Sequence, residues 1–245
     1  MSFLKRLDKV TDDTLLDLCQ RSKRIEMGHN KYGIYAIPAS SAHRNESKVL
    51  MGGGVWAEDV VDYMIDNIGT GDAVTAGAWC GDMLPALSHA CKEGTVWAFE
   101  PNLDNWRCAA VTVRLNKLHN VRLYHAALGA TAGTGTLVTH DYAGFAMGGA
   151  SWIQREPSYE KRKTEHTPIV TIDATVPAHS VVSIVQLDTE GYEPRVLLGA
   201  VETLRRCSPI LVVETAPGVD WFEEHAPGYR IVPGVVKGDT VLRRD

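Results

Sequence analysis

The stretch DAVTAGAWCGDMLPALSHACKEGTVWAFEPN, residues 72–102, decides the fold of this chain. A short apolar run meets Gly77, Gly81 follows, and a helical pattern begins at Asp82. A second apolar run ends at Glu100. Strand, glycine turn, helix, strand and acidic residue, in that order, are typical of half a doubly wound nucleotide-binding sheet. We expect Gly77 to let a ligand lie against the backbone, so that Gly77→Val abolishes binding in a folded protein. We expect Glu100 to accept hydrogen bonds from ribose hydroxyls.

The glycine spacing separates two classes of cofactor. A dinucleotide site usually has Gly-x-Gly-x-x-Gly, because a pyrophosphate lies over the helix N-terminus. Here Trp79 stands where the middle glycine is needed, and its indole would collide with a pyrophosphate. The turn therefore favours a ligand without phosphates, such as S-adenosylmethionine. The other interpretation is an ordinary strand-to-helix turn, with Glu100 as a solvated strand end.

Length and composition predict one cytoplasmic α/β domain with extensions. The chain has 245 residues, 44% of them hydrophobic, and a net charge of -5, which argues against nucleic-acid binding. Its first residues lack the apolar core of a signal peptide, and no apolar run approaches the roughly 20 residues that span a bilayer. Five scattered cysteines indicate a reduced protein, and no cluster has metal-ligand spacing. We expect no nucleic acid, membrane or metal as partner, and the composition leaves a homo-oligomer open.

Apolar runs and helical patterns alternate from residue 72 onward, which predicts a mostly parallel, doubly wound sheet. The expected strands are 72–76, 96–100, 121–125, 183–188 and 209–214. The expected helices are 82–92, 103–117 and 191–206. A hairpin of 229–232 and 240–243 would close one sheet edge. Residues 71–245 would then form the Rossmann-like catalytic domain.

Two further segments flank or interrupt this domain. Residues 1–70 are expected to form an N-terminal extension that packs on the core. Its expected elements are a helix ending near Arg21, a strand at 32–37, a loop at 45–54 and a helix at 56–68. Residues 141–166, between extra strands at 135–140 and 168–172, form an insertion rich in glycine and polar groups. Long irregular insertions beside a crevice are often functional, so we expect a lid over the acceptor site that is mobile without ligand.

A cluster of polar residues, DTEGYE at 188–193, follows the run SIVQL, which is expected to be a buried strand. The carboxyl ends of strands hold the ligands in open α/β sheets, so Asp188 and Glu190 should face the same crevice as Gly77. The negative charge of Glu193 suits the first turn of the next helix. Glu214 ends the following strand, where it could be salt-bridged or solvated.

The run VQLDTEGYEPRVLLGA, followed by LVVE, resembles the FkbM-type methyltransferases. The upstream segments GAWCGD, AFEPN, LNKLHNV and AALGA resemble the same family in the same order, so that the likeness covers roughly residues 55–215. The resemblance implies a class I S-adenosylmethionine-binding fold. It also implies O-methylation of a hydroxyl on a sugar or natural-product-type small molecule.

The resemblance also implies a set of cofactor-binding residues. They are Thr75, Gly77, Ala78, Trp79, Gly81, Asp82, Glu100, Pro101, Asn102 and Ala126. The family usually has an Asp at the position of Thr75, which helps hold the methionine part of the cofactor. A hydroxyl brings no charge, so Asp82 or the pair Asp188 and Glu190 would have to substitute. Trp79 replaces the usual small Asn.

Methyl transfer needs a nucleophile placed in line with the sulfur–methyl bond, and a hydroxyl nucleophile also needs a base. Asp188 and Glu190 are the leading candidates, and their proximity would raise one pKa. His140 is the second candidate base, with Asp141 to orient it. Two other functions stay open: a nicotinamide-dependent oxidoreductase, against which Trp79 speaks, and a non-catalytic cofactor-binding protein, with which Thr75 is consistent.

Overall fold

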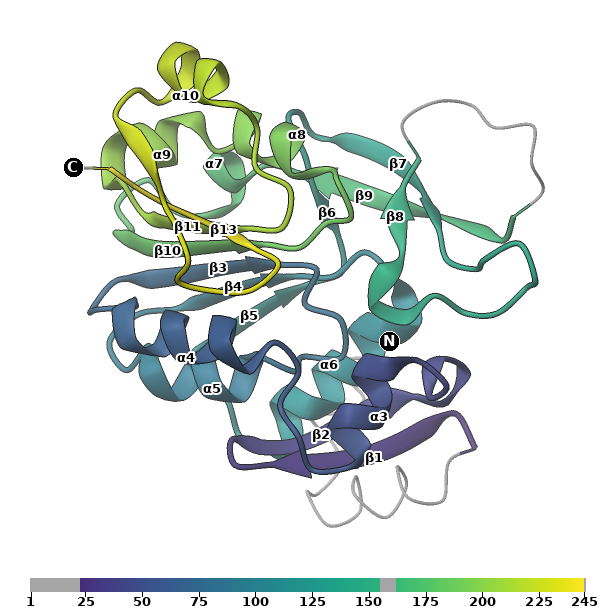
Figure 1. Cartoon of the computed structure of the whole chain (residues 1–245). Helices are drawn as coiled ribbons and strands as arrows, with labels where there is room; N and C mark the ends of the chain where they lie inside the picture. The colour runs from purple at the N-terminus through teal and green to yellow at the C-terminus, as the bar shows by residue number, and fades with distance from the viewer. Residues whose placement is uncertain (1–22, 155–161, 245) are drawn as a thin grey trace.

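The computed structural model describes residues 23–154 and 162–244. A seven-stranded sheet with the order β12-β13-β11-β10-β3-β4-β5 lies at its centre (Figure 1). The strands are β3 (Asp72–Ala76), β4 (Val96–Phe99), β5 (Val121–Tyr124), β10 (Val182–Leu187), β11 (Ile210–Val213), β12 (Tyr229–Val232) and β13 (Thr240–Arg244). Strand β13 runs antiparallel to both β11 and β12, and the other pairs are parallel. This confirms the expected α/β class with a C-terminal antiparallel hairpin.

Helices cover both faces of this sheet, because alternate side chains of the central strands point to opposite sides (Figure 1). One layer comprises α4 (Glu58–Asn67), α5 (Leu84–Ala90) and α6 (Leu103–Leu115). The other comprises α7 (Ile172–Thr175), α8 (Glu193–Leu198), α9 (Val201–Cys207) and α10 (Val219–His225). Ala73 packs in the core under α4 and α5, whereas Val74 packs in the core under α8 and α9. Every residue of β3 is buried, which places its carboxyl end inside the molecule.

Two expected elements are wrong. The helix expected at 191–206 is divided into α8 and α9, because Gly199 packs against backbone: a Cβ there would lie 2.1 Å from the Gly129 carbonyl oxygen. The loop expected at 45–54 contains a helix, α3 (Asn45–Met51), which buries Leu50 completely. The Gly-Gly-Gly run that suggested a loop begins where α3 ends.

The N-terminal extension packs against helix α6. Strand β2 (Gly33–Pro38), expected as a lone strand, pairs in an antiparallel hairpin with β1 (Ile25–Asn30), which the sequence did not reveal. The Ala36 N–H donates to the Thr112 hydroxyl of α6 at 3.1 Å. A short 3-10 helix, η1 (Ala39–Ser41), then leads toward α3. The helix expected to end near Arg21 lies outside the described residues.

The insertion belongs to a second, four-stranded sheet with the order β6-β9-β7-β8. Its strands are β6 (Ala127–Leu128), β7 (Gly133–Val138), β8 (Trp152–Ile153) and β9 (Thr164–Val170), with the 3-10 helix η2 (Gly148–Ala150) before β8. The expected strand at 168–172 is therefore displaced, since Ile172 begins α7. Part of the expected lid, residues 155–161, lies outside the described residues. No helix among residues 23–154 and 162–244 has the length and apolarity that a membrane crossing requires.

Candidate active site

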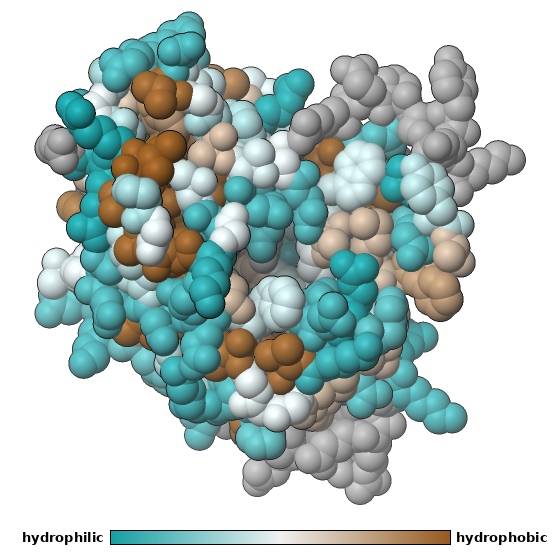
Figure 2. Space-filling model, in the orientation of Figure 1, coloured by the Kyte–Doolittle hydropathy of each residue, from teal (hydrophilic) through white to brown (hydrophobic). Residues whose placement is uncertain are grey.

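A cavity of about 480 Å³ opens at the carboxyl ends of β3, β10 and β11. Figure 2 shows it as a hollow near the centre of the face, rimmed mainly by hydrophilic side chains. At its floor, Thr75 of β3 lies beside Gln186 of β10, and the Thr75 hydroxyl donates to Gln186 Oε1 at 2.5 Å. Both side chains are buried. Where the family usually has a charged Asp, this chain therefore has a neutral hydrogen-bonded pair.

The turn at Gly77 needs glycine because it packs tightly against neighbouring backbone. Gly77 has a φ of 81°, and a Cβ there would lie 1.8 Å from the backbone oxygen of Asp188. That contact is far too short for any side chain, so the expectation that Gly77→Val stays folded is wrong. The N–H groups of Gly77 and Ala78 both donate to the Phe99 carbonyl at 3.1 Å, which fixes the turn on strand β4.

Glu100 holds this turn in place from within. It is 3% exposed, its Oε2 accepts from the Trp79 N–H at 2.7 Å, and its Oε1 accepts from the Asn102 N–H at 2.8 Å. The amide of Asn105 also donates to Oε1, at 3.4 Å. Burial raises the pKa of Glu100 to about 8. A carboxylate offers about four acceptor positions, so one is left for a ribose hydroxyl.

Eight of the ten expected cofactor residues line two adjoining cavities. Thr75, Gly77, Ala78, Trp79 and Asp82 line the large cavity. Gly77, Glu100, Pro101 and Ala126 line a small neighbour of about 30 Å³, which η2 and β8 also border. The structure brings the other two to neither: Gly81 packs toward α6, and the Asn102 side chain caps α6 by accepting from the N–H of Asp104 at 3.0 Å.

The DTEGYE run forms a turn that a buried carboxylate clamps. Glu190 and Gly191 both have left-handed backbone, with φ of 56° and 82°. Glu193 is 0% exposed, and its Oε1 accepts from the N–H groups of Thr189 at 2.7 Å and Gly191 at 3.2 Å. Its role is therefore more than the helix-dipole charge expected from its position. By fixing this turn, Glu193 positions Asp188 and Glu190 at the cavity.

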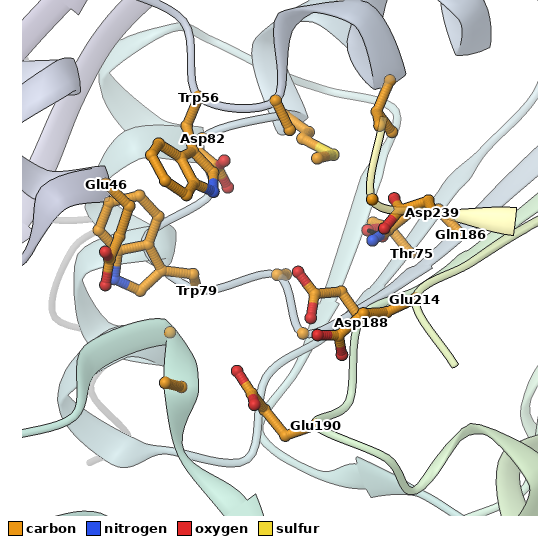
Figure 3. Close-up of a pocket in the computed structure, with 18 of the residues that line it drawn as sticks. Glu46, Trp56, Thr75, Trp79, Asp82, Gln186, Asp188, Glu190, Glu214 and Asp239 are labelled. Atoms are coloured by element: carbon orange, nitrogen blue, oxygen red, sulfur yellow. Dashed lines mark hydrogen bonds between the residues drawn. The ribbon is translucent and has the colours of Figure 1, made fainter. Parts of the chain in front are cut away.

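Four carboxylates gather on this side of the cavity (Figure 3): Asp188, Glu190, Glu214 and Asp239. The Asp188 and Glu214 carboxyl groups lie side by side (Figure 3), so a proton on either one would relieve the repulsion between them. Burial, then the charges of Glu214 and Glu190, raise the pKa of Asp188 to about 8. Burial likewise raises the pKa of Asp239 to about 6. Glu214 is exposed, in agreement with the solvated strand end that its place in the sequence suggests, and no ion pair to it is seen in the described part of the chain.

The opposite side of the cavity combines aromatic and acidic side chains. Trp56, Trp79, Glu46 and Asp82 lie together there (Figure 3). Burial raises the pKa of Asp82 to about 7. The Trp79 indole is 4% exposed, and its Nε1 has no hydrogen-bond partner in the described part of the chain. Sequence reasoning missed Glu46 because it is on α3, and Asp239 because it is in the β12–β13 loop.

His140 does not reach this cavity. It lies in a separate cavity of about 60 Å³, where its Nδ1 is 2.9 Å from the Thr139 hydroxyl. Burial lowers the pKa of His140. Asp141, expected to orient His140, instead accepts from the N–H groups of Ala143 and Phe145 and shapes its own loop. The structure therefore separates the second candidate base from the first.

Comparison with solved structures finds methyltransferases at low sequence identity. Methyltransferase FkbM from Methylobacillus flagellatus KT has a TM-score of 0.47 and 17% identity, covering 71% of this chain and 43% of that one. TYW2 from M. jannaschii, solved with AdoMet, has a TM-score of 0.47 and 12% identity over 91% and 88%. A SAM-dependent methyltransferase from Aquifex aeolicus has a TM-score of 0.40 and 14% identity over 77% and 88%. This chain thus spans less than half of the Methylobacillus protein.

Comparison of the sequence with family models shows which family this chain belongs to. Comparison with curated proteins gave no match. A model of the FkbM methyltransferase domain matches residues 72–228, which include the glycine turn, Glu100 and the whole DTEGYE run. The match is to a methyltransferase family, as the sequence indicates, and it gives no support to the two alternative functions. This chain belongs to the FkbM methyltransferase family.

Proposed function

We propose that this methyltransferase transfers a methyl group to a hydroxyl of a small molecule bound in the large cavity. The observation that carries the proposal is the pair of neighbouring carboxyl groups, Asp188 and Glu214, which line the cavity beside the glycine turn (Figure 3). A singly protonated pair retains one negative charge, so it can accept the proton that a hydroxyl loses during attack. Glu190, whose pKa burial and Glu214 also raise, stands next to this pair.

S-adenosylmethionine, when bound, supplies the activated methyl group. The residues present fit it in two parts. Thr75, Gln186 and the turn at Gly77 offer neutral hydrogen-bonding groups for the methionine end. Glu100, Pro101 and Ala126 border the small cavity, where a ribose would find the one acceptor position left on Glu100.

The small cavity must open before a nucleoside can enter. Its 30 Å³ has room for about one water molecule. The segment that borders it, from Gly149 of η2 to Ile153 of β8, belongs to the insertion that we expect to act as a lid. We therefore propose that η2 and β8 move away when the cofactor binds. Limited proteolysis of the free and the S-adenosylhomocysteine-bound protein tests this, since a cleavage pattern in the insertion that ligand leaves unchanged would contradict a lid.

Calorimetric titration tests the function itself. S-adenosylhomocysteine should bind, NAD should not, and labelled S-adenosylmethionine with a panel of hydroxyl-bearing sugars and natural products should reveal an acceptor. Binding of NAD alone would overturn the proposal. Methylation confined to nitrogen acceptors would refute the O-directed reaction but leave the family activity intact. A cytoplasmic location and the absence of nucleic-acid partners stay predictions.

A further inference from the structure

The large cavity carries many more negative than positive groups. Six carboxylates line it, namely Glu46, Asp82, Asp188, Glu190, Glu214 and Asp239, against two cations, Arg44 and Lys237. Arg44 is already paired with Glu46, at 3.3 Å. Among residues 23–154 and 162–244, no Lys, Arg or His nitrogen lies within 4 Å of the other five carboxylates. A cavity that concentrates one sign of charge attracts ligands of the opposite sign.

The aromatic side of the cavity suits the same kind of ligand. The indoles of Trp56 and Trp79 line it beside Asp82 (Figure 3). A cation that packs on an indole face is attracted by the ring's quadrupole, and most strongly for Trp. The buried, unpartnered Nε1 of Trp79 is a free donor at the same wall, so a polar ligand group that accepts a hydrogen bond would satisfy it.

We propose that the methyl acceptor carries at least one protonated amine besides the hydroxyl that is methylated, as an amino sugar or an aminocyclitol does. The inference rests on the proposed function and names the substrate class of that site. The carboxylates would bind the ammonium group by charge-assisted hydrogen bonds, which are roughly twice as strong as neutral ones.

The cofactor alone does not account for this charge. S-adenosylmethionine has a sulfonium, an ammonium and a carboxylate, and hence one net positive charge. The five carboxylates for which the described residues show no ion pair exceed that requirement, even if Asp188 and Glu214 together count as one charge. A divalent metal is the other cation to consider, but no group of three His, Cys, Asp or Glu in the described residues is placed to hold one.

The ionisation of the cavity carboxyl groups agrees with a cationic ligand. Burial and mutual repulsion raise the pKa values of Asp82, Asp188, Glu190, Glu214 and Asp239. An ammonium group among them would lower these pKa values again. Binding near pH 7 should therefore release protons, which titrations in two buffers of different ionisation enthalpy would detect.

The test compares a diamine with its neutral derivative. The probes are 2-deoxystreptamine and its di-N-acetyl form, titrated into enzyme saturated with S-adenosylhomocysteine. We expect the diamine to bind at least tenfold more tightly, with proton release, and more weakly at high salt. Asp239→Asn should reduce that preference about three- to tenfold, because it removes one cavity charge at constant shape. The matched control Asp220→Asn, exposed on α10, should leave the preference unchanged.

Three results would overturn the inference. They are equal or tighter binding of the di-N-acetyl form, failure of the diamine to bind at millimolar concentration, and a preference that Asp239→Asn leaves intact. Specific binding of Mg²⁺ that displaces the diamine would also assign the carboxylates to a metal. If S-adenosylhomocysteine itself does not bind, the proposed function has failed. If it binds while the diamine does not, only the acceptor class is wrong.

Discussion

Replacing Asp188 by Asn should make the protein more stable and less active. Asp188 has a pKa of 3.8 in its ordinary state and about 8 in the fold. The folded chain therefore holds a proton that the unfolded chain releases between about pH 4 and 8, and stability falls as pH rises through that window. For an isolated group, these values correspond to about 4 kcal/mol of lost stability at pH 7.

The gain from Asp188→Asn should be smaller than this limit. Glu214 lies beside Asp188, and an amide at position 188 could donate a hydrogen bond to the Glu214 carboxylate. We expect a gain of about 1–2 kcal/mol, which raises Tm by roughly 2–8 °C in a chain of this size. The same substitution removes the leading candidate base and should lower single-turnover methyl transfer by roughly 10²–10³.

Thermal unfolding of the wild type and of Asp188→Asn at pH 8, 6 and 4.5 tests the predicted gain in stability. The rate of methyl transfer to an acceptor found by screening tests the predicted loss of activity. The gain in Tm should be largest at pH 8 and shrink toward pH 4.5, because Asp in the unfolded chain is then partly protonated. Asp220→Asn serves as the surface control. A lower Tm for Asp188→Asn would refute the idea that the Asp188–Glu214 pair destabilises the fold. An unchanged rate would refute the role of Asp188 in methyl transfer.

Three other predictions concern the groups that hold the site together. Gly77→Val should yield little soluble protein because of the backbone contact at 1.8 Å, whereas Gly133→Ala, with no atom within 4 Å of its Cβ, should purify normally. Glu100→Ala should weaken S-adenosylhomocysteine binding more than tenfold and also lower Tm, since the Trp79 N–H loses its acceptor; normal binding would contradict both roles. Glu193→Ala should cost about 2–3 kcal/mol, and urea unfolding that matches wild type would show that the turn holds without it.

The sequence predicted the sheet well because short apolar runs are local signals. Strands β3, β4, β5, β10 and β11 lie within about two residues of their expected bounds. Helix α3 was missed because its helical signal is short and is followed by three glycines, and only tertiary contact shows that Leu50 is fully buried. Packing against Gly129, remote in sequence, likewise divides the helix expected at 191–206.

The residues of the candidate site also differ in whether local sequence signals predict their position. Asp188 and Glu190 could be placed from the sequence because a parallel strand delivers its carboxyl end to a known edge of the sheet. Asp239 could not, since it lies in the loop of the β12–β13 hairpin, and predicting the hairpin does not tell where its loop packs. His140, the second candidate base, lies in another cavity, because the strand that precedes it belongs to a second sheet that the sequence did not separate from the first. The DTEGYE motif therefore predicts one wall of the cavity, whereas the residues of the opposite wall are known only from the structure.

The two turns that meet at the cavity are built in the same way. Each contains a non-glycine residue with left-handed backbone, Trp79 in one and Glu190 in the other, a conformation that costs about 1–3 kcal/mol. A fully buried carboxylate offsets that cost in each case: Glu100 accepts the Trp79 N–H, and Glu193 accepts the N–H groups on either side of Glu190. These two side chains accept hydrogen bonds from backbone, whereas the neighbouring carboxyl groups Asp188 and Glu190 line the cavity. The acidic residues of the family motifs thus have two separate roles: some accept backbone hydrogen bonds and others line the cavity. Their burial in the structure distinguishes the two roles, whereas the sequence alone does not.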